Sequence, residues 1–271
     1  MKSNNQALFV LLATIVFCCP FDRVMANPSS IDWWGDTITA TGLSRLSSTA
    51  GSQAKKAAAD LATQNGTLRL RRILYQLPVT NDATLGMALV RFPTLQPLMS
   101  RELTKEIAPG RVIAPDLLEV RVKASLSRLR RLVGPVLLGK DPTTVEESDE
   151  PKVASTLIIT PPEGVNFKPG LLPLLGCAEK TRDVYLRRLI AAHIIAGAPI
   201  NYITKAVAKA KSKTASVIKA DAVGGLGRAC LYLKDAVADR VIDSLKSSTK
   251  ENPVEIAIIL PKASDSRPKT Q

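Results

Sequence analysis

The chain has few of the residues that most often carry out catalysis or bind nucleic acid. Its 271 residues include one histidine, four cysteines and only 4% aromatic residues. A histidine-based triad would have to use His193, which lies in an apolar run where a histidine is usually a hydrogen-bonded core residue. Basic residues are not interleaved with aromatic ones, so a stacking surface for single-stranded nucleic acid is not expected.

Recognisable catalytic motifs are missing as well. No serine lies in a nucleophile elbow, and neither Cys177 nor Cys230 belongs to a known catalytic signature. Residues 224–227 (Gly-Gly-Leu-Gly) have neither the Lys-Ser/Thr of a phosphate loop nor GxGxxG spacing, so they predict a turn. Glu146 and Glu147 lie in a polar stretch that cannot hold two carboxylates as an acid/base pair. The sequence therefore predicts a protein that is not an enzyme and uses no cofactor or metal.

Long apolar runs are also scarce, and the clearest one lies at residues 7–20. Lys2 supplies a positive charge before this run, and a cleavage site after it ends at Ala26. The run is too short to span a bilayer. Its two cysteines follow large residues, so a lipid anchor is not expected. We therefore predict an exported chain whose signal peptide, residues 1–26, is removed by cleavage.

Two cysteines remain after the leader, Cys177 and Cys230. A lone pair in an oxidising compartment can form a disulfide, which would add roughly 3–4 kcal/mol of stability in the chain-entropy model. Two buried, unpaired thiols are the alternative. The spacing of the pair matches neither a CxxC redox motif nor a zinc site.

Positive charge is in clear excess, with 37 Lys and Arg against 24 Asp and Glu and a net charge of +13. This excess favours an acidic partner, such as an anionic membrane surface, an envelope polymer or an acidic protein, and a solvated surface is the alternative. Trp33 and Trp34 could dock a partner, or instead cap the core of the first sheet. Four lysines predict a basic helix face that could contact an anionic partner: Lys205, Lys209, Lys211 and Lys213.

Apolar periodicity predicts strands and helices in both halves of the chain. In the first half, alternation over residues 118–126 indicates a strand with one packed and one solvated face. A short strand is expected at 37–41, ended by Gly42. Helices are expected over 54–74, with a kink or break at Asn65-Gly66, and over 95–107.

In the second half, the last strand is apolar enough to be central in its sheet. Strands are expected at 156–160, 214–220, 228–233 and 254–260, a helix at 233–245, and either a strand or a helix at 185–195. We predict an α+β fold of two small mixed sheet-and-helix units, with helices packed on one face of each sheet. The predicted units are residues 30–138 and 153–261, joined by an acidic linker at 139–152 and followed by a flexible tail at 262–271.

Several short segments, in this order, carry a family resemblance. They are residues 39–42 (Thr-Ala-Thr-Gly), the alanine-rich 54–61, 77–79 (Leu-Pro-Val), 157–159 (Leu-Ile-Ile), 168–173 (Lys-Pro-Gly-Leu-Leu-Pro), 217–220 (Val-Ile-Lys-Ala) and 254–260. Together they resemble the twenty-kilodalton Lpp-type lipoproteins and the flagellar FlgP and FlgT proteins of Gram-negative envelopes. The chain departs from this family at 160–162 (Thr-Pro-Pro), where an Asp-Ala-Arg turn is usual, and it lacks the lipidated cysteine.

The resemblance implies a periplasmic, non-catalytic assembly protein, some of whose relatives build rings or disks around a flagellar rod. Its expected partners are copies of itself or other envelope and flagellar proteins, and not nucleic acid. Self-association would follow if strand 118–126 or strand 254–260 lay at a sheet edge. The alternative, based on the net charge, is a periplasmic binding module for an anionic envelope polymer or lipid surface.

Overall fold

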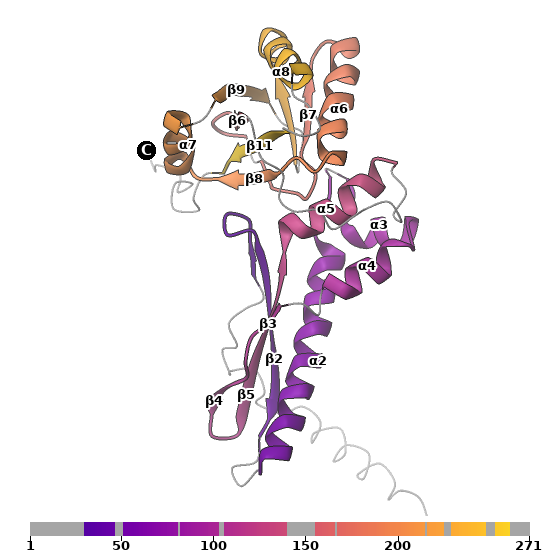
Figure 1. Cartoon of the computed structure of the whole chain (residues 1–271), viewed down its shortest axis with the longest axis vertical. Coiled ribbons are helices and arrows are strands. Elements are labelled where there is room, and N and C mark those ends of the chain that lie inside the picture. The colour runs from indigo at the N-terminus through magenta and orange to yellow at the C-terminus, as the bar shows by residue number, and fades with distance from the viewer. Residues whose placement is uncertain are drawn as a thin grey trace, which may run out of the picture.

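The computed structural model describes residues 30–46, 51–80, 82–102, 106–139, 155–165, 167–214, 216–224, 229–247 and 253–260. The predicted signal peptide, almost all of the acidic linker and the predicted tail lie outside these residues. The described chain forms two sheets packed with helices (Figure 1), so the predicted α+β class is confirmed. Among the helices of these ranges, none combines the length and the apolar composition that crossing a bilayer requires.

The first sheet is antiparallel, and its strands follow the order β1-β2-β5-β3, with β4 also paired to β5. Its members are β1 (Ser30–Asp32), β2 (Thr37–Arg45), β3 (Glu106–Ile107), β4 (Arg111–Ala114) and β5 (Leu117–Ser125). The predicted alternation in β5 is confirmed, because Leu118, Val120 and Val122 are buried while Lys123 is exposed. Glu119 is the exception: it is buried and forms an ion pair with Arg121 at 3.0 Å.

Helix α2 (Ser52–Gln76) covers the first sheet as one continuous helix, so a break into two helices at Asn65-Gly66, one of the two predicted outcomes, is wrong. Gly66 lies where the helix meets the strand β2, and a Cβ added there would be 2.8 Å from a methyl group of Val122. A Cβ on Gly42 would overlap the carbonyl oxygen of Ala62 in the helix. Both glycines allow a close backbone approach, and β2 continues through Gly42 where the sequence predicted its end.

Side chains of α2 also cover the open side of β2. Strand β1 pairs only with Thr37–Thr39, so the rest of β2 has no strand on that side among the described residues. There the Asn65 side-chain amide donates to the carbonyl oxygen of Leu43 at 3.0 Å, and Arg69 donates to that of Thr41 at 3.0 Å. These bonds satisfy backbone acceptors that an edge strand would otherwise leave open.

The second sheet is mixed, with the strand order β7-β10-β9-β6-β11-β8. Its members are β6 (Ser155–Thr160), β7 (Leu174–Cys177), β8 (Ile200–Ile203), β9 (Ser216–Gly224), β10 (Cys230–Leu233) and β11 (Val254–Ile259). The central position predicted for β11 is confirmed, because it pairs in parallel with β6 and β8 and every residue is buried. Neither β5 nor β11 is an edge strand, so the condition set for self-association through them is not met.

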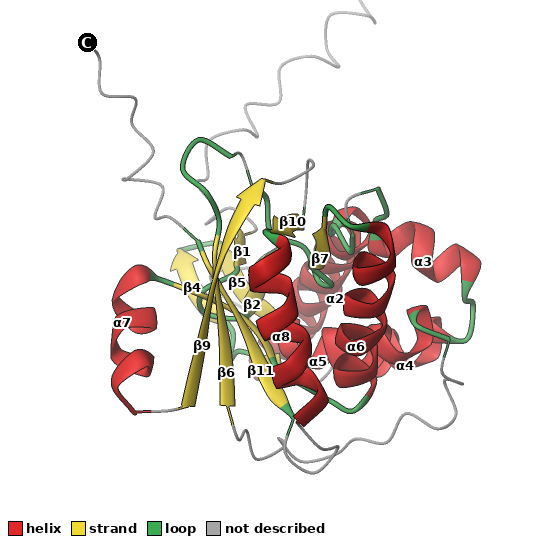
Figure 2. Cartoon of the chain, turned by 90° about the horizontal axis from the view of Figure 1, so that it is seen from above, coloured by secondary structure: helices red, strands yellow, loops and turns green. Residues whose placement is uncertain are grey.

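Helices cover both faces of the second sheet (Figure 2). Helices α6 (Lys180–Ile195) and α8 (Asp235–Ser247) pack on one face, and the ambiguous segment 185–195 is therefore helical. Helix α7 (Lys205–Thr214) lies on the other face, where Ala208 belongs to the same buried apolar cluster as Ile158 and Ala257. The prediction placed helices on one face of each sheet, whereas in the second sheet helices cover both faces.

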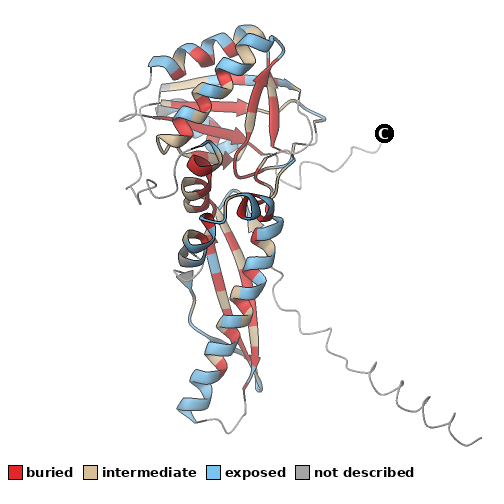
Figure 3. Ribbon diagram, turned by 90° about the vertical axis from the view of Figure 1, so that its right-hand side faces the viewer, coloured by how far each residue is buried: buried red, intermediate tan, exposed pale blue. Residues whose placement is uncertain are grey.

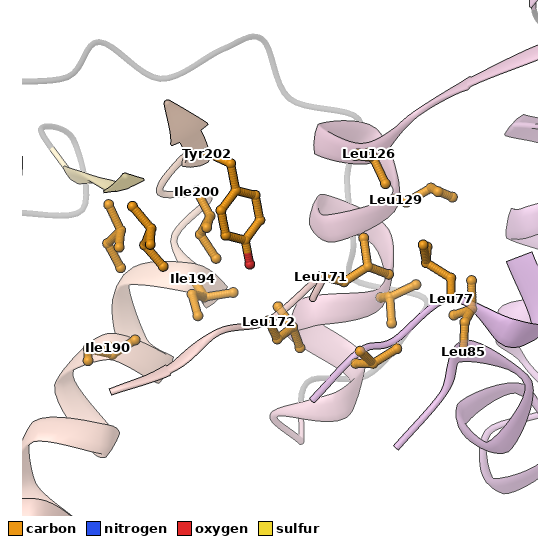
Figure 4. Packing of buried hydrophobic residues seen from close by; sticks show 14 of the residues in the cluster. Leu77, Leu85, Leu126, Leu129, Leu171, Leu172, Ile190, Ile194, Ile200 and Tyr202 are labelled. Atoms are coloured by element: carbon orange, nitrogen blue, oxygen red, sulfur yellow. The ribbon is translucent and has the colours of Figure 1, made fainter. Parts of the chain in front are cut away.

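Three shorter helices lie where the two sheets meet: α3 (Leu85–Arg91), α4 (Leu95–Glu102) and α5 (Leu126–Leu137). The helix predicted for 95–107 is too long, since residues 106–107 form β3. One hydrophobic core runs through both units, and Figure 4 shows part of it: Leu77, Leu85, Leu129, Leu171, Leu172, Ile194, Ile200 and Tyr202. Burial is most complete in the second sheet, whereas the outer face of α2 is exposed (Figure 3).

Candidate functional site

A tight connection after α2 places helix α3 at the junction of the two units. Pro78 forms a β-bridge with Thr84, and the amide of Val79 donates to the carbonyl oxygen of Ala83 at 2.8 Å. The Thr84 hydroxyl then accepts a hydrogen bond from the amide of Met87 and caps the first turn of α3. The start and direction of this short helix are therefore fixed by local hydrogen bonds.

Helix α3 presents apolar side chains to solvent. Leu85 and Leu89 are buried in the core, but Met87 is 58% exposed and Val90 is 77% exposed on the opposite side. Gly86 lets the helix lie close to α2, since a Cβ there would be 2.8 Å from the Tyr75 ring. A helix with apolar residues on all sides is normally covered on all sides, so this exposed face indicates a contact surface.

The exposed face of α3 forms one wall of an apolar groove with a volume of about 870 Å³. The other walls are the end of α5, residues 172–175 including the start of β7, and α6. Among the described residues that line the groove, the charged ones are Arg91 and Arg187. Arg187 forms an ion pair with Asp183 at 2.8 Å. The groove thus combines an apolar floor with basic residues, and its lining within the described ranges includes no carboxylate.

Strand β7 adds an open backbone edge to this groove. Among the described strands it pairs with β10 alone, and the amide of Leu174 donates to the carbonyl oxygen of Ala229 on that side. Backbone groups alternate in direction along a strand, so the N–H and C=O of Leu175 point away from β10. The amide of Cys177, also on this side, is satisfied by the carboxylate of Asp183 at 3.0 Å. The groove therefore borders a strand edge at Leu175.

Trp33 and Trp34, the predicted docking aromatics, lie in different surroundings. Trp33 is half-buried and packs edge-on against Tyr202 of the second unit, with ring centroids 5.4 Å apart. Trp34 is 44% exposed. Trp33 therefore helps to join the units, and Trp34 is the tryptophan that is open to solvent.

Arg130 of α5 lies behind this aromatic contact and links the units by hydrogen bonds. Its Nη1 donates to a carboxylate oxygen of Asp36 at 3.0 Å and to the carbonyl oxygen of Ile200 at 2.6 Å. The guanidinium also lies over the Tyr202 ring, 5.6 Å from its centroid. Burial lowers the pKa of Arg130, which Tyr202 and Asp36 partly oppose, and burial raises the pKa of Tyr202 to about 12.

The four predicted lysines lie on α7 but do not form one equivalent set. Lys205, Lys209 and Lys213 are exposed and remain candidates for contact with an anionic partner. Lys211 instead binds both carboxylate oxygens of the buried Glu255, at 2.5 and 2.6 Å. Its charge therefore serves the packing of α7 on the sheet, a role that the lysine spacing alone did not reveal.

The predicted bridge between Cys177 and Cys230 is wrong, because both thiols are free and buried. In the parallel register of β7 and β10, Cys177 pairs with Leu233 and Cys230 pairs with Leu174. The cysteines are thus offset by three residues on neighbouring strands, which is about 10 Å and exceeds the reach of a disulfide. Burial raises the pKa of the Cys177 thiol, and nearby Asp183 adds to the effect.

His193 is a core residue, as predicted. It is buried on α6, and its Nε2 lies 2.9 Å from the carbonyl oxygen of Leu245 in α8. A carbonyl oxygen can only accept, so the proton is on Nε2. In the described ranges, no three His, Cys, Asp or Glu side chains gather where they could hold a metal ion.

Neither the apolar groove nor the contacts of Arg130 with Asp36, Ile200 and Tyr202 were predicted from the sequence. The apolar run at 85–90 (Leu-Gly-Met-Ala-Leu-Val) was one available signal for an exposed helix face, because its apolar residues do not keep to one side. No comparable signal marked Arg130. The chain matches no model of a known protein family, and no characterised protein is significantly similar to it in sequence.

Proposed function

We propose that the chain is an exported, non-enzymatic component of the cell envelope that docks another protein in the groove between its two units. The observation that carries this proposal is the apolar groove of about 870 Å³ with Met87 and Val90 exposed on its wall. Exposed apolar surface of this kind typically marks an interaction site. Methionine suits such a surface, since its flexible side chain adapts to different partners.

The open edge of β7 favours a protein partner over a small apolar molecule. The backbone groups of Leu175 require hydrogen-bond partners that a peptide strand supplies and a hydrocarbon does not. The groove arginines, Arg91 and Arg187, favour an apolar segment with acidic residues beside it. A second copy of this chain is disfavoured by its net charge of +13.

The proposal agrees with the non-catalytic assembly role that the family resemblance implies. An association with a flagellar ring or disk is one form of it. The periplasmic location rests on the signal peptide predicted for residues 1–26 and on that resemblance.

Site-specific photo-crosslinking in the native envelope tests the docking site. A photoreactive amino acid at position 87 is expected to give one discrete adduct, whose partner is identified by mass spectrometry. Position 223 is the matched control, because Val223 is 50% exposed on β9 and does not line the groove. Val90→Asp, in the same chain, should abolish the adduct while circular dichroism stays unchanged.

The proposal fails if position 87 gives no adduct, or if positions 87 and 223 give the same adducts. An adduct that survives Val90→Asp would also contradict docking in the groove.

The alternative function, binding to an anionic polymer or lipid surface, is supported by Lys205, Lys209 and Lys213, exposed on α7. Replacing all three by glutamate would then reduce binding to vesicles that contain anionic lipid. Binding by the unmodified chain would fall steeply as salt rises. Binding that resists both changes would exclude this alternative.

A further inference from the structure

A second hollow lies at the junction of the two units and is polar. It has a volume of about 400 Å³, which is within the usual range for small-molecule sites. Its walls come from the β1–β2 turn, α5, the backbone that follows α6, and strands β8 and β11. The polar side chains that line it are Asp36, Ser127, Arg130, Arg131, Asn201 and Glu255.

Arg130 is the unusual member of this polar cleft. Its side chain is 5% exposed, and its Nη1 is occupied by Asp36 and Ile200. Its Nε and Nη2 are buried and have no hydrogen-bond partner among the described residues. The Tyr202 ring packs near the guanidinium, but its hydroxyl is engaged with Gly170: it accepts from the Gly170 amide at 3.0 Å and donates to the Gly170 carbonyl oxygen at 2.6 Å. Buried donors without partners are uncommon and costly.

The two unpartnered nitrogens lie side by side on one edge of the guanidinium. Nε–H and one Nη2–H point in the same direction in one plane, and this pair of donors matches the two oxygens of a carboxylate. The carboxylates already present are committed elsewhere. Asp36 also accepts bonds from Ser125 and Ser127, and Glu255 is held by Lys211.

The charges around the cleft favour a single negative charge on the ligand. Arg130, Arg131 and Lys211 are positive, whereas Asp36 and Glu255 are negative, which leaves one positive charge in excess. A monocarboxylate would balance this excess. A phosphate dianion would add charge beyond this excess and would be repelled by both carboxylates.

We propose that this cleft binds a small organic monocarboxylate, whose two oxygens accept hydrogen bonds from Nε and Nη2 of Arg130. Arg131 supplies a second positive charge on the cleft wall, and the Asn201 side chain, whose amide donates to Glu255 at 2.8 Å, lines the cleft from β8. Nε and Nη2 are covered in the structure, so binding requires neighbouring side chains to move. Because Arg130 joins Asp36 of the first unit to Ile200 of the second, an occupied cleft would stabilise the junction.

Calorimetric titration of the mature chain at constant ionic strength tests the ligand class. Propionate and benzoate are expected to bind saturably and to raise the melting temperature. Propionamide, which has the same shape as propionate without the charge, is expected not to bind. Phosphate is expected to bind at least tenfold more weakly than propionate.

Two variants test the site itself. Arg130→Lys keeps the charge but removes the paired donors, and it should weaken propionate binding at least tenfold. Arg131→Ala leaves the Arg130 contacts intact and should weaken binding several-fold. Arg91→Lys, in the apolar groove, is the control and should bind propionate unchanged. If Arg130→Lys does not fold, Arg131→Ala and the comparison of propionate with propionamide test whether the cleft binds a monocarboxylate.

The proposal is overturned if no carboxylate binds saturably, if propionamide binds as well as propionate, or if folded Arg130→Lys keeps full affinity. Tighter binding of phosphate would contradict the carboxylate class. These outcomes do not depend on the protein partner of the apolar groove, because the crosslinking at position 87 tests that partner separately.

Discussion

In the first sheet, helix and strand touch through two glycines, Gly42 and Gly66, whereas in the second sheet large aliphatic side chains fill the space between helices and strands. The first contact is possible because glycine has no side chain, so almost any substitution there adds atoms where there is no room. The second depends on side chains that are present, so truncation leaves a cavity. The same protein thus contains two kinds of helix–strand contact. The first is destabilised by larger side chains and the second by smaller ones.

The largest effect is expected in the first unit from Gly42→Ala. The new methyl group would overlap the backbone carbonyl of Ala62, which cannot rotate away as a flexible side chain could. We expect a loss of about 4 kcal/mol or more in the free energy of unfolding, measured by urea denaturation. Gly51→Ala is the control, since nothing lies within 4 Å of its added Cβ, and it should cost less than about 1 kcal/mol. Equal losses in the two variants would refute the close-contact explanation.

A smaller loss is expected in the second unit from Ile258→Ala. Ile258 is fully buried on the central strand β11, and its truncation should cost about 3 kcal/mol. Val223→Ala, on the exposed surface of β9, should change stability by less than about 0.5 kcal/mol. If Ile258→Ala cost as little as Val223→Ala, packing volume would not explain how the second sheet is held.

A third variant, Glu255→Gln, tests the polar contact between α7 and the second sheet. Burial alone would raise the pKa of Glu255, but hydrogen bonds from Lys211, Asn201 and Thr156 outweigh it and lower the pKa. A lowered folded-state pKa means that the stabilisation is fully present above the unfolded-state pKa and is lost as pH falls through the folded-state value. We expect a loss of about 2 kcal/mol at pH 7, because the pair is buried but Lys211 is partly exposed.

The pH dependence of that loss distinguishes the ion pair from a change in packing. The difference between wild type and Glu255→Gln should shrink as pH falls below the ordinary range of a glutamate. A difference that is constant from pH 7 to pH 3 would show that charge is not involved. Asp243→Asn, at an exposed pair with Lys246 on α8, should have almost no effect at any pH.

The smallest expected effect is that of a reducing agent, which should leave the melting temperature unchanged. Cys177 and Cys230 are free, so the second unit is held by packing without a covalent cross-link. Mass spectrometry after alkylation should find both cysteines modified in the denatured chain without prior reduction. Reaction of Cys177 in the native chain should be slow, because its raised pKa leaves little thiolate. A melting temperature that falls when a reducing agent is added would show that Cys177 and Cys230 form a disulfide after all.

Patterns within one element allowed most of the fold to be predicted. Alternation identified β5, the apolar content of residues 254–260 placed β11 at the centre, and spacing identified α2 and α8. The errors arose where tertiary contacts changed the meaning of a local signal. Gly42 and Gly66 are usually read as breaks, but here they allow two elements to approach closely. Residues 106–107 form a strand because β5 pairs with them.

The candidate sites could not be predicted in the same way, because they form where distant segments meet. The groove combines α3 with α6 and β7, and the polar cleft combines Asp36 with Arg130 and Asn201. Nothing near Arg130 in the sequence shows that its side chain will be buried with unpaired donors. The expected compartment and the number of cysteines left a disulfide and two free thiols as alternatives, and the strand register decides between them because it sets the distance between the two sulfur atoms.

The central position of β11 also constrains the order of folding. This strand is the last of the described elements, yet it lies between β6 and β8, which pair with it in parallel. The second sheet therefore cannot close until residues 254–259 have emerged from the ribosome, and its contacts are distant in sequence, which slows folding. Until then β6 and β8 lack the strand that joins them, whereas the strands of the first sheet all come from residues 30–125 and are complete much earlier.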